Sequence, residues 1–475
     1  MFLRQITDSA LAQNAYLIGC QRSGEAIIVD PERDTDRYLE LAAENFFRIV
    51  AVAETHIHAD YLSGAREFVE RHGAMAYLSA EGGTDWQFEW AKGNANARFL
   101  HDGETFRIGN IELKALLTAG HTPEHLSFLV TDIGGGADEP IALLSGDFLF
   151  VGDVGRPDLL ESAAGHAGVM EPSARQLYQS LQATRSLSDH LQILPAHGAG
   201  SACGKALGAV PTSVLGYERR FNVALHQALN GPEESFVAEI LAGQPEPPLY
   251  FARMKRENRL GPELLPEGKL PRPCELSPAS VETWLRLPLH RAIDLRGDRS
   301  AFLASHLKGA IFTPIAGGMF PFSAGSYLAP DQHLLLVVEN EAQVDTAVRQ
   351  LIRIGLDRID GWILAENVGV ATATIRAKTS DFAKLMAKHP GAVVLDVRGS
   401  TEFAAGHVEG ALNIAYTRLA ARLNELDPRK LHLVHCGSGL RASMAVSFLE
   451  SQGISTIHVD GDFSEIPRDL LAPQS

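Results

Sequence analysis

Short apolar runs alternate with amphipathic stretches along the first half of the chain. AYLIG and EAIIVDP are typical of paired strands joined by a turn at 21–24, and RIVAVAET is typical of a buried strand. Residues 34–45 and 172–186 have helical spacing, whereas FRIGNIELKALL has the pattern of a hairpin. We therefore expect an α/β domain over residues 1–242.

The pattern breaks between residues 243 and 273. GQPEPP, GPELLPEG and PRP make this stretch rich in Pro and Gly, so we expect a linker with YFARMKREN as a short helix inside it. Beyond it, a motif that starts DLRG at Asp294 recurs as DVRG at Asp396, about 102 residues later. This period is too long for a solenoid and indicates two tandem α/β domains, at 274–370 and 378–475.

Composition narrows the class of protein. The 475 residues are 45% hydrophobic and 21% charged, as in ordinary globular proteins, and a net charge of -16 offers no attraction for a nucleic-acid backbone. Four cysteines are too few for a disulfide framework, and they form no CxxC pair. The N-terminus lacks the apolar core of a signal peptide. The sequence contains no run of about 18 apolar residues, so we expect no membrane span. We expect a cytoplasmic protein that binds neither nucleic acid nor membranes.

Potential metal ligands follow several of the predicted strands. His56, His58 and Asp60 come directly after RIVAVAE, and their spacing points them to one side of an extended backbone. Three further loops each place one such side chain after an apolar strand, namely His121, Asp147 and His197. Ligands gathered from the strand ends of an α/β scaffold suit a catalytic metal.

These loops resemble the metallo-β-lactamase fold, in its glyoxalase II and persulfide dioxygenase branch. THIHADYLSG matches the branch's THxHxDHxxG, TAGHTPEH its GHTxxH, and LLSGDFLFVGDVGRPDL its GDxLFxxxxGRxD. The resemblance covers residues 1–240 and implies an αββα fold. Tyr61 stands where two-metal members have a histidine of the second metal position. Because a phenol is a poor substitute for imidazole at zinc, we expect a single metal.

The resemblance to persulfide dioxygenases implies one Fe(II) per chain. Its ligands would be the counterparts in this chain of the family's two histidines and one carboxylate, namely His56, His121 and Asp147. Such a set leaves positions open for both O2 and the substrate. The remaining polar residues of these loops would orient the ligands and nearby waters, namely His58, Asp60 and His197.

Two further residues are candidates beside this site. Arg156 matches an arginine that contacts the thiol substrate in the glutathione users of the family, and a loop salt bridge with Asp153 or Asp158 is the alternative. Cys203, in the loop after His197, could accept a sulfane sulfur or be an inert thiol. That loop lacks the tyrosine of the glutathione users, so coenzyme A or another small thiol stays open beside glutathione.

A second chemical site is predicted in the last domain. LVHCGSGLRA places Cys436 between an apolar strand and a helix, so backbone N–H groups and the helix N-terminus can stabilise a thiolate, and Arg441 adds a cation. With DVRGSTEFAAGHVEGALNI, this loop resembles the rhodanese sulfurtransferases, which implies that Cys436 carries a persulfide. The loop residues would then bind the substrate, namely Gly437, Ser438, Gly439 and Leu440.

The first copy of the repeat lacks this equipment. Aligning LLLVVE with LHLVHC puts Glu339 at the position of Cys436, and a carboxylate would repel an anionic substrate. We expect the first copy to be a rhodanese-like domain without catalytic activity.

Together the resemblances indicate a persulfide dioxygenase–rhodanese fusion that acts in sulfide detoxification. Its expected reaction is oxidation of a low-molecular-weight persulfide by O2 to sulfite and thiol. Sulfane-sulfur transfer through Cys436 would form or consume thiosulfate. The family implies a homo-oligomer, a dimer or a tetramer. The alternatives are a glyoxalase II-like binuclear zinc thioesterase and a non-enzymatic persulfide sensor, and the thiol carrier and the direction of sulfur transfer stay open.

Overall fold

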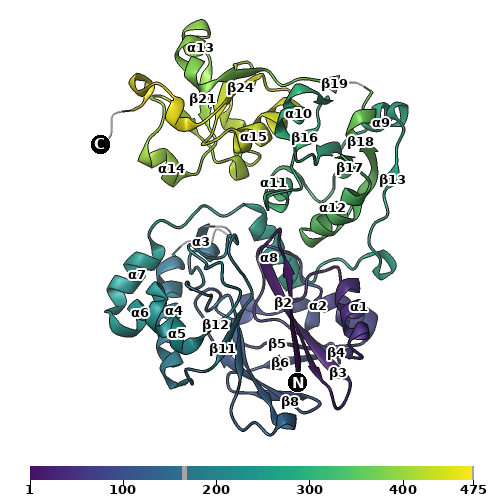
Figure 1. Cartoon of the computed structure of the whole chain (residues 1–475), viewed down its shortest axis with the longest axis vertical. Helices are drawn as coiled ribbons and strands as arrows, with labels where there is room; N and C mark the ends of the chain where they lie inside the picture. The colour runs from purple at the N-terminus through teal and green to yellow at the C-terminus, as the bar shows by residue number, and fades with distance from the viewer. Residues whose placement is uncertain (163–167, 370, 473–475) are drawn as a thin grey trace. The chain divides into compact units, whose positions relative to one another are not determined.

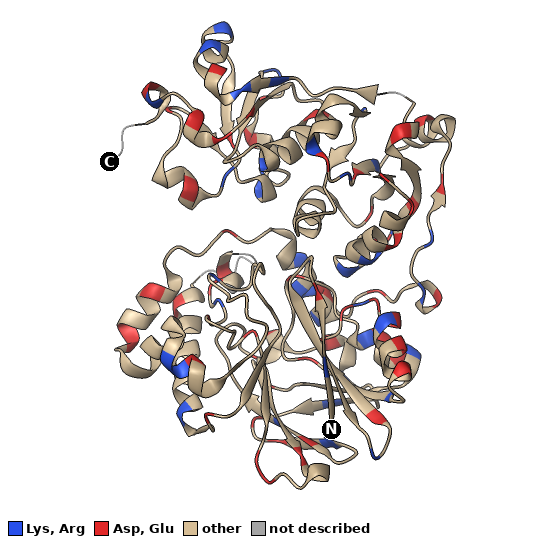
Figure 2. Cartoon of the chain, viewed as in Figure 1, with Lys and Arg blue, Asp and Glu red and all other residues tan. Residues whose placement is uncertain are grey.

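The computed structural model describes residues 1–162, 168–369 and 371–472. The chain divides into two compact units, Met1–Leu270 and Pro271–Ser475 (Figure 1). Among the described residues, no helix is long and apolar enough to cross a membrane. Figure 2 shows Lys and Arg scattered among Asp and Glu in both units.

The first unit contains two six-stranded sheets. One sheet has its strands in chain order, namely β1 (Phe2–Asp8), β2 (Gln13–Cys20), β3 (Glu25–Val29), β4 (Arg48–Ala53), β5 (Met75–Ser79) and β6 (Ala97–Leu100). The other sheet also has its strands in chain order, namely β7 (Thr105–Ile108), β8 (Ile111–Leu117), β9 (Leu126–Asp132), β10 (Ala142–Gly146), β11 (Gln192–Pro195) and β12 (Ser213–Val214).

A core of apolar side chains lies between these two sheets. In β8 the alternation of apolar and polar residues buries Ile111, Leu113 and Ala115, which pack with Ile27 of β3 and Phe128 of β9. Helices cover the outer faces (Figure 1). On the first sheet lie α1 (Asp36–Glu44) and α2 (Ala65–His72). On the second lie α4 (Met170–Ala183), α5 (Leu215–Phe221), α6 (Val223–Asn230) and α7 (Glu233–Leu241), while α3 (Leu159–Ser162) precedes α4. This layering is the αββα arrangement that the resemblance implied.

The segment 243–273 includes the short helix predicted inside the linker, but most of the segment, up to Leu270, belongs to the first unit. It contains α8 (Tyr250–Leu260), which belongs to the first unit because one of its faces is apolar and buried. That face consists of Tyr250, Phe251 and Met254. Asn258 on the same helix accepts a hydrogen bond from the N–H of Ser63 (2.8 Å) and donates one to the carbonyl oxygen of His58 (2.8 Å). The first unit therefore extends to Leu270 and includes a helix that holds the loop after β4.

The second unit contains two five-stranded sheets with the same strand order. The first runs β13 (Cys274–Glu275), β18 (Ile359–Leu364), β17 (His333–Val338), β14 (His290–Asp294) and β16 (Ile311–Phe312). The second runs β20 (Arg376–Lys378), β24 (Thr456–Asp460), β23 (His432–His435), β21 (Val393–Asp396) and β22 (Leu412–Asn413). All neighbouring strands in both sheets are parallel. The repeat in the sequence is thus a repeat in topology, although both copies lie in one compact unit.

The remaining elements of the second unit are mostly helices. They are α9 (Pro278–Trp284), α10 (Arg299–Ala304), α11 (Phe320–Tyr327), α12 (Ala342–Arg353), α13 (Phe382–Lys388), α14 (Ser400–Ala405) and α15 (Leu440–Ser451), with β15 (His306–Leu307) and β19 (Ala371–Thr372) paired in a small sheet. Helix α15 of the second copy contacts the first copy. The hydroxyl of Ser447 accepts a hydrogen bond from the N–H of Phe312 (2.8 Å), and Phe448 stacks on Tyr327 with ring centroids 4.6 Å apart.

Candidate metal centre and thiolate loop

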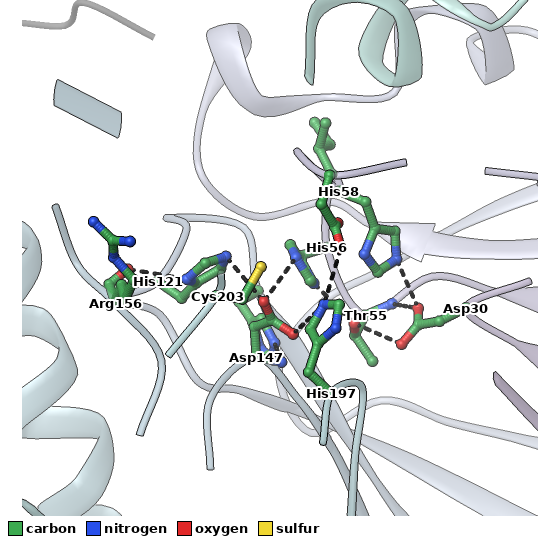
Figure 3. A network of polar contacts seen from close by, with 12 residues as sticks. Asp30, Thr55, His56, His58, His121, Asp147, Arg156, His197 and Cys203 are labelled. Atoms are coloured by element: carbon green, nitrogen blue, oxygen red, sulfur yellow. Dashed lines mark hydrogen bonds and ion pairs between the residues drawn. The ribbon is translucent and has the colours of Figure 1, made fainter. Parts of the chain in front are cut away.

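The predicted ligands lie in loops that directly follow strands of the two sheets. His56 follows β4, His121 follows β8, Asp147 follows β10 and His197 follows β11. Each of these side chains is at most 2% exposed. Figure 3 shows them gathered around the carboxylate of Asp147. His56 and His197 are 141 positions apart in the sequence (197 minus 56), and the fold brings their loops together in one buried site.

Three of these residues form a group of the size that holds a metal ion. The Nε2 atoms of His56 and His121 lie 3.9 Å and 3.4 Å from Oδ2 of Asp147. Both carboxylate oxygens of Asp147 are buried, and apart from an interaction with the thiol of Cys203 they have no hydrogen-bond partner among the described residues. Burial raises the pKa of the Asp147 carboxyl to about 6. Buried acceptors without a donor are costly, so this set fits a divalent cation as the missing partner.

Neighbouring groups fix which ring nitrogen of His56 and of His121 faces the carboxylate of Asp147. Nδ1 of His56 lies 3.0 Å from the hydroxyl of Thr55, and that hydroxyl donates to Oδ2 of Asp30 (2.9 Å). Nδ1 of His121 lies 2.9 Å from the carbonyl oxygen of Arg156. Because Nδ1 of each ring is engaged, Nε2 is left free to bind a metal.

His58 does not join this group. Its Nε2 lies 3.2 Å from Oδ1 of Asp30 and 2.9 Å from Oε2 of Glu54, and both carboxylates are buried. Burial alone would lower the pKa of His58, but the two carboxylates raise it well above its ordinary value. The ring packs against His56 with centroids 4.2 Å apart. His58 is therefore a charged support beside the site, and the group of His56, His121 and Asp147 contains two imidazoles.

A second group of donors lies on the other side of Asp147. Nε2 of His197 is 3.5 Å from Oδ1 of Asp147 and 3.5 Å from Oδ2 of Asp60. Cys203 joins His197 and Asp60 in a buried set whose ligand atoms lie within 4.8 Å of one another. Burial, and then the charges of Asp60 and Asp147, raise the pKa of the Cys203 thiol well above its ordinary value. Tyr61 points away, since its hydroxyl contacts Gln13 and the carbonyl of Asp30.

The sequence left two roles open for Arg156, a contact with the substrate and a salt bridge within its loop, and the structure has the salt bridge. Its Nε and Nη2 donate to the two carboxylate oxygens of Asp158, at 2.9 Å and 2.7 Å. Nη1 donates to the carbonyl of Ala202 (3.1 Å), which precedes Cys203. The guanidinium is buried, so the role of Arg156 in this structure is to fix the loops that carry His121 and Cys203.

Sequence reasoning missed four residues that shape this site. Asp30 directly follows β3 and Glu54 directly follows β4. An acidic residue at the end of an apolar strand is the sequence pattern that could have identified both. Thr55 precedes the first ligand. Lys255 lies on α8, a helix that the sequence predicted but placed in a linker away from the ligands. Burial lowers the pKa of its ammonium to about 7, and its charge acts on His56.

Cys436 lies at the carboxyl end of β23, as predicted. Its Sγ accepts hydrogen bonds from the N–H groups of Gly439 (3.1 Å) and Ala442 (3.4 Å), so backbone donors surround the sulfur. Helix α15 starts at Leu440, directly after this loop, and Ser438 is exposed at its tip. Cys436 itself is 2% exposed and forms no disulfide. This is a nest of donors suited to a sulfur anion.

Arg441 does not contact the sulfur directly. Its guanidinium donates to both carboxylate oxygens of Glu402, at 2.6 Å and 2.8 Å, and this pairing raises the pKa of Arg441. Glu402 comes from α14, within the DVRGSTEF motif. The pair lies beside Gly437, where a side chain would approach the Arg441 guanidinium. Arg441 is thus held over the loop by a partner that the sequence had not assigned.

The first copy contributes a cation next to this loop. Arg299 of α10 pairs with Asp460 (2.6 Å) and lies 3.4 Å from the hydroxyl of Ser443. Gly439 has φ +91 and no room for a side chain, because a Cβ there would collide with Arg299 and Asp460. The first copy therefore packs against the residue whose N–H donates to Cys436.

Strand register corrects the alignment of the two copies by one residue. Asp294 pairs with Val337 in the first copy, and its counterpart Asp396 pairs with His435 in the second. Val338, rather than Glu339, is therefore the counterpart of Cys436. A valine offers no nucleophile. The prediction that the first copy lacks catalytic activity therefore rests on Val338 instead of Glu339.

Comparisons with known proteins agree with this architecture. Residues 8–197 match the metallo-beta-lactamase superfamily, and residues 379–468 match the rhodanese-like domain. The solved structure of a metallo-beta-lactamase from Staphylococcus aureus subsp. aureus COL is 38% identical, with a TM-score of 0.66; the match covers 77% of this chain and 99% of that one. The family match to rhodanese covers only the second copy, so a rhodanese-like first copy stays a prediction, supported by the shared strand order.

Two curated relatives illustrate the chemistry found among similar proteins. The mitochondrial persulfide dioxygenase ETHE1 of Bos taurus is 27% identical over 170 residues, which are 34% of this chain and 59% of the relative. A hydroxyacylglutathione hydrolase-like protein of Homo sapiens is 30% identical over 182 residues, which are 38% of this chain and 54% of the relative. The chain belongs to the metallo-beta-lactamase superfamily and carries a rhodanese-like domain over residues 379–468.

Proposed function

We propose that this chain oxidises a low-molecular-weight persulfide with O2 to sulfite and thiol, at one Fe(II) per chain, and transfers sulfane sulfur through Cys436. The observation that carries the proposal is the buried set of His56, His121 and Asp147, from which His58 is turned away. Two imidazoles and one carboxylate are the ligands of non-haem iron oxygenases, and they leave coordination positions open. Similarity to a persulfide dioxygenase supports the substrate class.

Each residue of the site has a role in this proposal. His56, His121 and Asp147 would hold the iron, which when bound supplies adjacent positions for O2 and the persulfide sulfur. Thr55 and the carbonyl of Arg156 keep the two imidazole rings oriented. Burial of all three ligands excludes water that would otherwise compete for the site.

Cys436 would carry the second half of the chemistry. Its thiolate attacks the outer sulfur of thiosulfate, which forms a cysteine persulfide and releases sulfite. A small thiolate then attacks that outer sulfur, regenerates the Cys436 thiolate and leaves as a persulfide. The N–H groups of Gly439 and Ala442 stabilise the sulfur anion at both stages. Each step is a reversible exchange, so the direction depends on which of sulfite and thiosulfate is in excess. We further expect this pathway to work in the cytoplasm and the chain to form a homo-oligomer.

Metal analysis combined with an oxygen electrode tests the proposal. We expect about one iron per chain and O2 uptake when glutathione persulfide or coenzyme A persulfide is added. Asp147→Ala should lose both iron and O2 uptake, because it removes the only carboxylate of the set. Cys436→Ser should lose sulfur transfer and keep O2 uptake. Zinc with thioester cleavage and no O2 uptake would refute the proposal.

A zinc thioesterase is the alternative with an observation in its favour. Such an enzyme needs a second metal, and Asp60, His197 and Cys203 form a buried donor set next to Asp147. Similarity to a hydroxyacylglutathione hydrolase-like protein points the same way. Two zinc ions per chain in the purified protein, together with hydrolysis of a glutathione thioester, would favour this alternative.

A further inference from the structure

A cluster of two histidines and one aspartate lies in the first copy of the repeat, separate from both sites described above. One ring nitrogen of His290, one of His333 and a carboxylate oxygen of Asp360 lie within 4.8 Å of one another. The three residues come from β14, β17 and β18, which are neighbours in one sheet. All three lie at the amino-terminal ends of these strands, whereas Cys436 follows the carboxyl end of its strand.

Strand geometry brings the three side chains together. His290 pairs directly with His333 in the parallel register, and their rings lie 4.8 Å apart. Pairing between β17 and β18 passes from Leu334 with Ile359 to Leu335 with Gly361, so Asp360 is an extra residue in β18. A bulge of this kind re-aims a side chain. It places the carboxylate of Asp360 3.0 Å from Nδ1 of His333.

A tryptophan of α9 supports the cluster. Nε1 of Trp284 donates to Oδ2 of Asp360 (3.0 Å), and the indole packs on the ring of His290 with centroids 4.3 Å apart. Nδ1 of His290 is buried and has no hydrogen-bond partner among the described residues. An oriented carboxylate beside an imidazole nitrogen that lacks a partner is the arrangement that a metal ion completes.

The fold itself does not require these residues. Register places Ala392 and Leu431 of the second copy at the positions of His290 and His333, given that Asp396 corresponds to Asp294. Two copies of one topology thus differ at this edge, where one has two ligand-type side chains and the other has two apolar ones.

We propose that His290, His333 and Asp360 bind a divalent transition-metal ion of the zinc class. Two imidazoles and one carboxylate suit zinc, with water in the fourth position. Donors bound to zinc at about 2.0–2.2 Å lie about 3.3–3.6 Å apart, so atoms already within 4.8 Å need only side-chain adjustment. The ion takes the place of the hydrogen between Nδ1 of His333 and Asp360, and the neutral His333 ring carries that hydrogen on Nε2 instead. It would join three strands and the end of α9 at one edge of the sheet.

Zinc titration of the full, iron-loaded chain by calorimetry tests this proposal. The double variant His290→Ala/His333→Leu installs the residues that the second copy uses at these positions. We expect the wild-type chain to take up one zinc ion more per chain than this variant. Trp284→Phe should weaken that uptake about 10- to 100-fold, because it removes the donor that orients Asp360. A matched control is His101→Ala, which removes an exposed histidine that pairs with one carboxylate, Glu81 (3.2 Å), and should leave uptake unchanged.

Equal zinc uptake by the wild-type chain and the double variant would overturn the proposal, as would an equal loss in His101→Ala. If the double variant does not fold, Asp360→Asn decides, because it keeps the hydrogen-bonding shape and removes the charge. Zinc should also raise the unfolding temperature of the wild-type chain and not that of Asp360→Asn. These readouts do not depend on persulfide oxidation or sulfur transfer.

Discussion

Removing the Thr55 hydroxyl tests whether the residues behind the ligands control metal binding. Thr55 Oγ1 donates to Asp30 (2.9 Å), so it must accept from Nδ1–H of His56 (3.0 Å), which fixes the tautomer that leaves Nε2 free. Thr55→Val keeps the shape of the side chain and removes both contacts. The His56 ring then loses its anchor, and Asp30 loses one of its donors.

The expected effect is a 10- to 100-fold weaker affinity for Fe(II), which is the usual cost of removing a group that orients a metal ligand. This corresponds to about 1.4–2.7 kcal/mol of binding free energy. The assay is an anaerobic Fe(II) titration, followed by O2 uptake at saturating iron, where activity should largely return because no ligand has been removed.

The matched control is Thr184→Val. Thr184 is also buried, and its hydroxyl donates to the carbonyl of Leu181 (2.6 Å), far along the chain from the ligands. Both variants lose a buried hydroxyl, so both should lose some stability, but only Thr55→Val should lose iron affinity. Iron affinity within twofold of wild type in Thr55→Val, or an equal loss in Thr184→Val, would refute the reasoning.

Four further predictions concern contacts near the two sites. Burial raises the pKa of Asp147 to about 6, so protons compete with iron below that pH, and Fe(II) affinity should fall about tenfold per pH unit between pH 6 and 5; a flat profile contradicts this. The metal-free protein should gain stability over the same fall in pH, since the folded carboxyl binds its proton more tightly than the unfolded one, and chemical unfolding measures this. Glu54→Gln should release His58 towards the metal and raise the zinc-to-iron ratio several-fold in protein supplied with both ions, and an unchanged ratio would count against a holding role for Glu54. Arg299→Ala should slow sulfur transfer about 10- to 100-fold, with partial recovery in Arg299→Lys and unchanged O2 uptake, as followed by thiosulfate consumption.

Local patterns predicted the parts of the site that lie on regular strands. The loops of His56, His121 and Asp147 were found because each follows an apolar run, and an apolar run followed by a polar loop fixes both the strand and the position of its end. Cys436 was found in the same way, since strand, glycine-rich loop and helix follow one another without a gap in the sequence.

Such local patterns could not predict contacts between segments that are distant in the sequence. Asp30 and Glu54 select the orientation of His58 from two different strands, and no spacing rule links them. The sequence could not decide whether Arg156 contacts the substrate or forms a salt bridge. Only the fold shows that Asp158 lies on the side that the guanidinium faces. Helix α8 was placed in a linker because Pro and Gly flank it, although tertiary packing overrides those flanks.

The position of α8 also bears on how this chain can be divided. A boundary at Ala242, where the apolar pattern weakens, would separate the ligand loop after β4 from Asn258, which bonds to the backbone of Ser63 and His58. The compact unit that keeps this loop together with its supporting helix ends at Leu270. A gene fusion or exchange cut at the last element of the sheets and their covering helices would carry the loop without that helix.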